Sequence, residues 1–416
     1  MDLKRVLMVA YHFPPLAGSS GIQRTLRFVQ QLPALGWQPL VLSADTRAYE
    51  HTSDDLLSEL PPALPVRRAF ALDTGRHLQI GGHHLLSMAL PDRWQTWRHD
   101  GVRQGMQMIK EFKPDLIWST YPIATAHLIG HGLAKRSGLP WVADFRDPML
   151  HEGFPSHQAR RDSFGRVEKL VFERARQVVV TTPGTQSLYR ERFPHMSERI
   201  SVLANGFDED SFVVASQHSV PIDTRRDRPL VLLHSGVVYP SERDPTQLFQ
   251  ALARLQRAGR LSPDQLRLRF RGSLHDEVVR RCAMEQGALD FIELAEELPY
   301  KEALAEMMSV DGLLLLQAAN CNLQVPAKFY EYLRAGRPVL GLTDPQGDTA
   351  NVLRSAGFET VLPLDQADVI EAELPAWLDR LREGTLRMPD ARTIMQASRI
   401  SRTHELAALF DGLLQR

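Results

Sequence analysis

An alternation of short apolar runs with segments of helical periodicity constrains the fold of this chain more than any other feature. Residues 6–10 form the first run, and its continuous apolar character is typical of a strand that is buried on both faces. The next segment places Ile22, Leu26 and Val29 at helical spacing. Because strand, helix and strand in succession build a parallel sheet with crossover helices, the pattern predicts an α/β protein.

The alternation occurs twice, and a polar segment separates the two series. The chain has 416 residues, a length that favours two domains over a single core. Residues 207–228 are charged and weakly periodic, so we interpret them as a linker between Rossmann-like domains over 1–206 and 229–403. Strands are predicted at 6–10, 40–43, 116–120, 141–145, 178–182 and 200–204 in the first domain, and at 230–235, 266–271, 291–294, 312–316 and 339–342 in the second.

Composition and charge exclude several classes of protein. The net charge is −1, which provides no general attraction to nucleic acid. Only Cys282 and Cys321 occur, so neither a disulfide framework nor a zinc knuckle is expected. No run approaches the ~18 apolar residues of a membrane span. We therefore expect a cytoplasmic protein with no nucleic-acid partner and no metal site; the Asp-x-Asp spacing from Asp208 to Asp210 falls in the presumed linker, where we interpret it as solvated charge.

In parallel sheets of this kind, ligands bind outside the carboxyl ends of the strands, so the loops that follow strands contain the candidate site. The first such loop contains Gly18 and Gly21 and leads into a helix. Glycines there allow a tight turn whose amides face an anion, although a plain strand-to-helix turn has the same composition. The glycine fingerprint of dinucleotide-binding proteins is absent after both opening strands, which argues against an NAD enzyme.

The strongest local signal is the segment 326–338, which reads PAKFYEYLRAGRP. Pro326 can open a helix and Gly336 can close it. Lys328 then lies in the first turn, where a cation opposes the helix dipole unless an anionic ligand is bound. A diphosphate is such a ligand, and Glu331 could accept hydrogen bonds from the hydroxyls of a ribose. An ordinary surface Lys–Glu pair fits the same spacing.

The loop after the first strand of the second domain contributes Gly236 and Arg243. Gly236 permits a close backbone approach, and Arg243 precedes the next helix, where a bidentate contact with phosphate is natural. The alternative is a solvated loop charge. Together with Lys328, Arg243 would neutralise a diphosphate without a metal.

Strand ends of the first domain offer further candidates. His127 follows the strand predicted at 116–120, and Arg146 and Asp147 follow the strand predicted at 141–145. These positions are expected to face the same ligand side as the glycine loop. His127 fits equally the commoner role of a packed histidine.

In order and spacing, these motifs resemble glycosyltransferase family four, the retaining enzymes of GT-B fold. The resemblance covers nearly the whole chain. The matching segments are 13–15, 18–24, 115–120, 141–148, 180–183 and 203–208 in the first half, and 235–236, 243–245, 328–332, Gly336 and Pro338 in the second. The resemblance implies two Rossmann-like domains that face each other across a cleft, an acceptor domain and then a donor domain, with helix 404–416 crossing back onto the first.

The resemblance also implies roles for individual residues. Donor binding would fall to Gly18, Gly21, Gly236, Arg243, Arg271, Lys328 and Glu331, with Arg243 and Lys328 on the diphosphate, Glu331 on the ribose and Arg271 near the base. His127 and Asp147 would line the sugar and acceptor side and share the catalytic role with Arg243 and Lys328. Leu323 stands where the family carries the first of two glutamates, so Asn322 or Gln324 would have to replace that contact with the sugar.

The implied function is a retaining glycosyltransferase that moves a sugar from a nucleotide diphosphate donor to a glycan or lipid-linked acceptor in surface polysaccharide synthesis. The nucleotide sugar is a co-substrate, and no cofactor is expected. Two alternatives stay open. One is a nucleotide-sugar 2-epimerase of the same architecture, and the other is a non-catalytic nucleotide-sugar-binding partner of an assembly complex, which Leu323 favours.

Two further features concern the acceptor. Six basic residues are interspersed with apolar ones between 160 and 176, a pattern typical either of a helix lying on the inner membrane face or of an ordinary amphipathic helix. Trp94 and Trp97 either contact an acceptor or pack in the core.

Overall fold

The computed structural model describes residues 3–19, 21–79, 81, 83, 85–221 and 227–415, which form two compact units. The first unit is Met1–Asn205 with Arg399–Arg416, and the second is Gly206–Ser398. Each unit has its own parallel sheet and its own apolar core. The prediction of an α/β fold with two Rossmann-like sheets is confirmed.

The first unit is built on a seven-stranded parallel sheet in the order β3-β2-β1-β4-β5-β6-β7. Its strands are β1 (Lys4–Val9), β2 (Trp37–Ala44), β3 (Val66–Ala69), β4 (Leu116–Thr120), β5 (Trp141–Phe145), β6 (Gln177–Val180) and β7 (Ile200–Val202). Strands β4 and β5 are buried at every residue, because they lie inside the sheet with both faces covered. Strand β3 was not predicted, because this edge strand of sequence Val-Arg-Arg-Ala has no apolar run.

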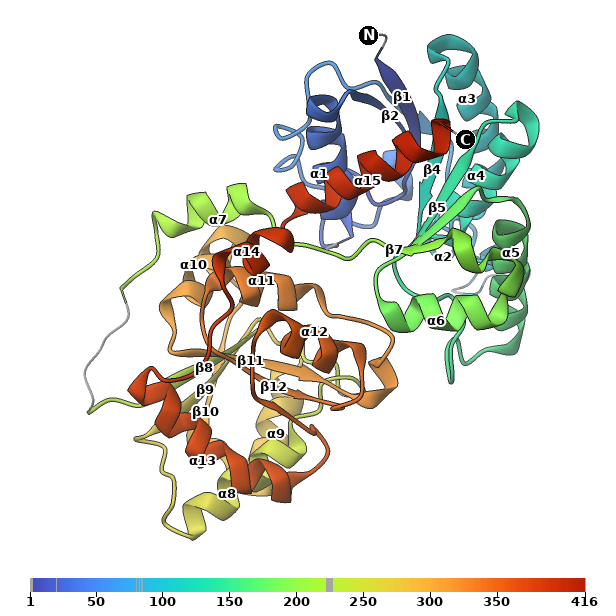
Figure 1. Cartoon of the computed structure of the whole chain (residues 1–416). Helices are drawn as coiled ribbons and strands as arrows, with labels where there is room; N and C mark the ends of the chain where they lie inside the picture. The colour runs from blue at the N-terminus through green and yellow to red at the C-terminus, as the bar shows by residue number, and fades with distance from the viewer. Residues whose placement is uncertain are drawn as a thin grey trace. The chain divides into compact units, whose positions relative to one another are not determined.

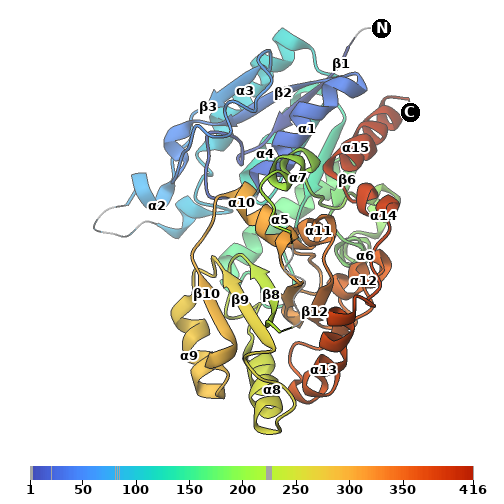
Figure 2. The same ribbon diagram turned by 90° about the vertical axis from the view of Figure 1, so that its left-hand side faces the viewer.

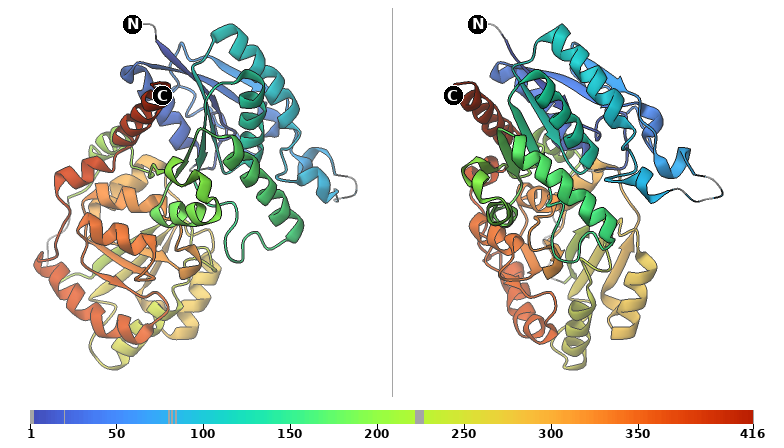
Figure 3. Two further views of the ribbon diagram at one scale, coloured as in Figure 1. Left: turned by 45° about the vertical axis from the view of Figure 1, so that its right-hand side comes forward. Right: turned by 90° about the vertical axis from the view of Figure 1, so that its right-hand side faces the viewer.

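Helices cover both faces of this sheet. Helices α3, α4 and α5 pack side by side on one face, and α1 and α15 lie together on the other (Figure 3). Right-handed crossovers explain the division, because α1 leads outward from β1 to β2 while α3 leads back from β3 to β4. The helices are α1 (Ile22–Gln31), α2 (Thr74–His77), α3 (Trp97–Phe112), α4 (Ala124–Ser137), α5 (Gln158–Arg174), α6 (Pro183–Arg192) and α15 (Arg399–Leu414), with 3-10 turns η1 (Leu32–Leu35), η2 (Thr46–Ala48), η3 (Leu86–Ala89) and η4 (Pro194–Arg199).

Helix α15 belongs to the first unit although it ends the chain, and it lies against α1 (Figure 1). Phe410 is fully buried, and its ring centroid lies 5.2 Å from that of Trp37. Asp411 accepts hydrogen bonds from the indole Nε1 of Trp37 at 3.0 Å and from Nζ of Lys4 at 2.6 Å. An aromatic contact and two hydrogen bonds therefore fix the last helix to β1 and β2.

The second unit is built on a six-stranded parallel sheet in the order β10-β9-β8-β11-β12-β13. Its strands are β8 (Leu230–Ser235), β9 (Leu266–Arg271), β10 (Ile292–Ala295), β11 (Gly312–Gln317), β12 (Val339–Thr343) and β13 (Val361–Leu362). Strand β13 was not predicted, because its two residues are too short to form an apolar run.

The helices of the second unit also divide between the two faces of the sheet. Helices α8, α9 and α13 cover one face, and α10, α11 and α12 cover the other (Figures 1 and 2). The helices are α7 (Glu209–Ser216), α8 (Thr246–Arg257), α9 (Asp276–Gln286), α10 (Tyr300–Ser309), α11 (Ala327–Ala335), α12 (Asp348–Ala356), α13 (Ala367–Glu383) and α14 (Ala391–Gln396), with 3-10 turns η5 (Leu289–Phe291) and η6 (Ala319–Cys321).

Part of the segment that we interpreted as a linker is helical. Asp208 caps helix α7 by accepting a 3.1 Å hydrogen bond from the amide of Ser211. The carboxylate of Glu209 accepts two 2.6 Å hydrogen bonds from Arg334 on α11. The interpretation as solvated charge is therefore wrong for Asp208 and Glu209, which begin a helix, where carboxylates are favoured, whereas Asp210 is exposed. Residues 222–226 of the same segment lie outside the described residues.

Phe410→Ala should lower the free energy of unfolding of the first unit by about 3–5 kcal/mol, because it removes a buried aromatic ring. Leu414→Ala is the control, since Leu414 is 39% exposed and its truncation should cost at most about 0.5 kcal/mol. Urea denaturation followed by tryptophan fluorescence measures both. Equal effects of the two variants would contradict the docking of α15.

Candidate functional site

The topology of the second unit defines where a ligand is expected. From β8 the chain builds outward through β9 to β10, and it then returns to the other side of β8 to form β11. The strand order therefore reverses between β8 and β11. In open parallel sheets, ligands bind at the carboxyl ends of the strands at such a switch point.

Lys328 lies at this switch point, in the first turn of α11. Its side chain is only 9% exposed, and its Nζ lies 2.9 Å from Nε2 of His234 at the end of β8. Gly236, with φ of +101°, makes the turn after β8. A Cβ built on Gly236 would lie 3.6 Å from Nζ of Lys328. The amino group therefore faces the backbone of the turn.

Arg243 is the second cation of this region. Its guanidinium lies 5.1 Å from the ring centroid of Tyr239 and donates a 2.5 Å hydrogen bond from Nη1 to the carbonyl of Val237. Its Nε is buried and has no hydrogen-bond partner among the described residues. Arg243 is close enough to lower the pKa of both Lys328 and His234. The structure thus brings the two predicted diphosphate-binding cations together.

The electrostatic state of the site follows from burial. Burial and the charge of Arg243 lower the pKa of Lys328 well below its ordinary value, while Glu331 acts in the opposite direction. Among the described residues, no carboxylate forms an ion pair with Lys328 or Arg243. Two basic side chains whose only nearby carboxylate, that of Glu331 among the described residues, forms no ion pair with them are suited to receive an anion.

Glu331 on α11 and Arg271 at the end of β9 both contact residues of α10. Glu331 accepts a 2.9 Å hydrogen bond from the hydroxyl of Tyr300, at the start of α10. Arg271 ends β9, and Glu306 holds its guanidinium through two hydrogen bonds of 2.8 Å. A third hydrogen bond of 2.8 Å joins Arg271 to the carbonyl of Glu296. Arg271 is therefore committed to contacts within the protein, which limits it to shaping the loop beside the expected base.

The glycine loop of the first unit has a packing constraint that the sequence did not reveal. Gly18, with φ of +73°, is exposed. At Gly21 the space is too small for any side chain, because an added Cβ would lie 2.2 Å from Nδ1 of His12 and 3.0 Å from Nη1 of Arg146. Arg146 also donates a 2.8 Å hydrogen bond to the carbonyl of Gly21. Arg146 thereby fixes the start of α1.

Asp147 follows Arg146 and is half-buried. Burial raises the pKa of its carboxyl, and the adjacent charge of Arg146 acts in the opposite direction. The structure places Asp147 at the carboxyl end of β5, as predicted. Its role in the site stays a prediction.

Comparisons with known proteins agree with this geometry. Residues 20–206 match the family model of the glycosyl transferase 4-like domain. No curated protein matches the chain. The chain carries a glycosyltransferase domain. Its two units together have the GT-B fold, as the following structures show.

Three solved structures are similar to this glycosyltransferase over almost their whole length. They are sucrose-phosphate synthase from Thermosynechococcus elongatus (TM-score 0.65, 14% identity, 99% of each chain covered), a glycosyltransferase from Rickettsia africae (0.64, 12%, 100% of each) and Anabaena HepE in complex with UDP (0.67, 13%, 98% of this chain and 100% of HepE). HepE has also been solved with UDP-glucose. The predicted resemblance to family four and its GT-B fold is confirmed.

His127 does not belong to the candidate site of the glycosyltransferase. Its side chain is 0% exposed, and its ring centroid lies 4.6 Å from that of Phe145. Its Nδ1 lies 2.8 Å from Oγ of Ser119, and its Nε2 is buried without a partner among the described residues. The alternative of a packed histidine is therefore correct, because α4 turns this face toward the sheet.

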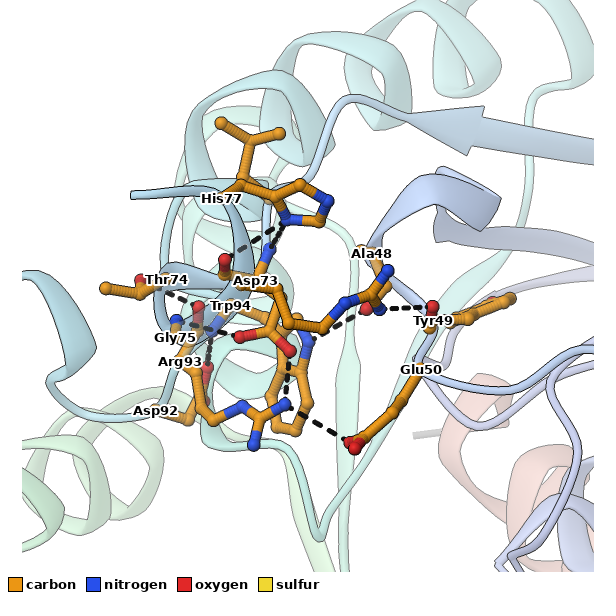
Figure 4. A network of polar contacts seen from close by, with 12 residues as sticks. Ala48, Tyr49, Glu50, Asp73, Thr74, Gly75, His77, Asp92, Arg93 and Trp94 are labelled. Atoms are coloured by element: carbon orange, nitrogen blue, oxygen red, sulfur yellow. Dashed lines mark hydrogen bonds and ion pairs between the residues drawn. The ribbon is translucent and has the colours of Figure 1, made fainter. Parts of the chain in front are cut away.

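A polar cluster that the sequence analysis missed follows the carboxyl ends of β2 and β3 in the first unit. Figure 4 shows Arg93 between Asp73 and Glu50, and its guanidinium lies 5.1 Å from the ring centroid of Trp94. The side chain of Arg93 is 40% exposed, whereas that of Asp73 is fully buried. Trp97 is fully buried, so of the two alternatives for this residue the packing role in the core is correct. The irregular loops that carry these residues have no periodicity from which the cluster could be found.

Hydrogen bonds fix the residues on either side of Leu323, the position at which family four carries a glutamate. Leu323 is half-buried. The side-chain amide of Asn322 donates a 2.6 Å hydrogen bond to Asp344, and the carbonyl of Gln324 accepts one of 3.0 Å from Thr349. Asn322 therefore links this loop to a carboxylate that follows β12.

Most of the basic segment lies in helix α5 (Gln158–Arg174), and two of its six cations bind backbone carbonyls of the same unit. Arg161 donates to the carbonyls of His151, Phe154 and Pro155, and Arg174 donates to that of Ala134. Within the part of the chain that the structure describes, no helix has the length and hydropathy of a membrane span.

His127→Asn should reduce the acid sensitivity of the protein. Burial lowers the pKa of His127 from 6.5 to about 3, so below pH 6.5 the unfolded chain binds a proton that the folded chain does not. The stability that comes from the neutral imidazole is therefore lost as the pH falls, by about 1.4 kcal/mol per pH unit. Denaturant titrations between pH 6 and pH 4 measure this slope in both proteins. Parallel slopes would show that His127 is accessible to protons in the folded state.

Proposed function

We propose that this protein is a retaining glycosyltransferase that transfers a sugar from a nucleotide diphosphate donor to a glycan or lipid-linked acceptor in surface polysaccharide synthesis. The observation that carries the proposal is the pair of cations, Lys328 and Arg243, beside the Gly236 turn at the switch point of the second sheet. HepE, which has the same fold, binds UDP and UDP-glucose. The donor is therefore a nucleotide sugar that enters as a co-substrate.

The chemistry of the leaving group supports these roles. When the bond between the sugar and the diphosphate breaks, negative charge develops on the phosphate oxygens. Lys328 is nearly buried, and preorganised cations in a site of low dielectric stabilise such charge more than water does. Two cations at this position supply the neutralisation that a divalent metal supplies elsewhere, so we propose a reaction that needs no metal. Retention of configuration is carried over from family four.

The acceptor side is proposed for the first unit. Gly18 and Asp147 follow β1 and β5, and the Arg93 cluster follows β2 and β3. All of these positions lie at the carboxyl edge of one sheet, where ligands of such sheets bind. A partly exposed arginine beside carboxylates suits an acceptor that carries hydroxyl groups. We place the reaction in the cytoplasm or at the inner face of the membrane, where a lipid-linked acceptor would be reached.

A non-catalytic nucleotide-sugar-binding protein is the second candidate. Leu323 favours it, because an apolar side chain stands where family four carries a carboxylate near the transferred sugar. Such a protein would bind the donor stoichiometrically and would not turn it over.

Lys328→Ala and Arg243→Ala should each lower the rate of transfer on the order of 10²–10³-fold, as loss of one charge-stabilising group does. Arg280→Ala is the matched control, since Arg280 is an exposed cation on α9. The measurement is release of nucleoside diphosphate from a panel of UDP-, GDP-, TDP- and ADP-sugars, in the presence and absence of EDTA. Normal turnover by both variants would refute the site. Tight donor binding without turnover in the wild-type protein would favour the binding function.

Glu331→Ala should separate recognition of the ribose from recognition of the diphosphate. The affinity for the nucleoside diphosphate should fall about ten-fold or more, as expected when a charged hydrogen-bond acceptor is lost. The affinity for inorganic pyrophosphate should stay constant or increase, because a negative charge near Lys328 is removed. Isothermal titration calorimetry with both ligands tests this, and equal losses for the two ligands would contradict the ribose assignment.

A further inference from the structure

We propose that His234 is a positioning residue that orients Lys328 toward the donor diphosphate by offering it a neutral nitrogen as hydrogen-bond acceptor. The inference rests on the proposed function and concerns a residue that acts through Lys328. His234 is fully buried as the penultimate residue of β8, and its Nε2 lies 2.9 Å from Nζ of Lys328. The contact joins β8 to α11 across the switch point.

The surroundings of the imidazole fix its protonation. Its Nδ1 lies 3.0 Å from the carbonyl oxygen of Leu314 on β11. A carbonyl can only accept, so the contact with Leu314 favours the tautomer that has a proton on Nδ1 and a lone pair on Nε2, which faces Lys328. The carbonyl of Val237 is a second backbone partner of the ring. Burial and the charges of Lys328 and Arg243 lower the pKa of His234 well below its ordinary value. The ring therefore stays neutral, and the direction of the hydrogen bond is from Lys328 to His234.

The geometry leaves Lys328 with spare donors. An ammonium group has three hydrogens, and within the described part of the chain His234 is the one hydrogen-bond partner of Nζ. Nζ also faces the Gly236 turn, where an added Cβ would approach it to 3.6 Å. Lys328 therefore uses one of its three donors to bind His234. This contact directs the other two donors toward the position where the diphosphate is expected.

Two substitutions separate this role from a merely structural one. His234→Gln places an amide oxygen where Nε2 stood, so an acceptor for Lys328 remains while the bond to Leu314 is lost. His234→Asn places an amide nitrogen where Nδ1 stood, so the bond to Leu314 remains while Lys328 loses its acceptor. If His234 only stabilised the core, ligand affinity would follow stability in both variants.

The test uses inorganic pyrophosphate as the probe, because it needs neither base nor sugar. Calorimetry should give a dissociation constant about ten-fold or more weaker for His234→Asn, as expected for a lost hydrogen bond to a charged group. His234→Gln should bind within about three-fold of the wild-type protein, because the acceptor is retained. Thermal unfolding without ligand should rank the variants in the opposite order, with His234→Asn the more stable. In the wild-type protein, long-range ¹⁵N NMR should show the Nδ1–H tautomer for His234.

Three results would overturn the inference. Wild-type affinity in His234→Asn would show that Lys328 needs no acceptor, and affinity that simply follows stability would show a structural role. In both cases, the proposed function would still be supported if the Lys328→Ala variant bound pyrophosphate more weakly than the wild-type protein does. A folded wild-type protein that binds neither pyrophosphate nor any nucleoside diphosphate would instead remove the proposed function, and the inference with it.

Discussion

The second unit depends on holding two basic residues, Lys328 and Arg243, close together, although no carboxylate in the described part of the chain forms an ion pair with either of them. Burial makes this costly, because a charge that leaves water must be compensated. The sheet supplies the position, since its order reverses between β8 and β11 and leaves their carboxyl ends free. Gly236 supplies the space, and His234 supplies the orientation. Each of these features suits a site that binds an anionic ligand.

Other cations of the chain show what a satisfied site looks like. Arg24 on α1 forms a buried ion pair with Asp144 through hydrogen bonds of 2.9 and 3.0 Å. It also donates to the carbonyls of Leu203 and Ala204, at the end of the first unit. Removing one partner of such a pair would leave a buried charge, which is why these pairs hold folds together. Lys328 differs from Arg24 in that its side chain contacts a neutral histidine and not a carboxylate.

The sequence predicted the features that depend on periodicity and missed those that depend on which way a side chain faces. Apolar runs located β4 and β5 at their observed bounds, whereas the edge strand β3 has two arginines and no such run. Lys328 was found because a cation in a first helical turn is unfavourable without an anion. His127 was misassigned because a histidine that follows a strand end can face the core or the solvent, and spacing does not distinguish these. His234 was overlooked for the same reason, as a polar residue inside an apolar strand.

The choice of a histidine beside Lys328 has a physical logic. A carboxylate at that position would hold the ammonium more strongly, but it would also cancel the charge and repel the phosphates. A neutral imidazole orients the ammonium without cancelling its charge, so burial and the charge of Arg243 still lower the pKa of Lys328. A bound diphosphate would reverse that shift, because an anion favours the charged form of the lysine. Binding of the diphosphate and protonation of Lys328 are therefore coupled, and the burial that lowers the pKa of Lys328 also strengthens its attraction to the phosphate oxygens.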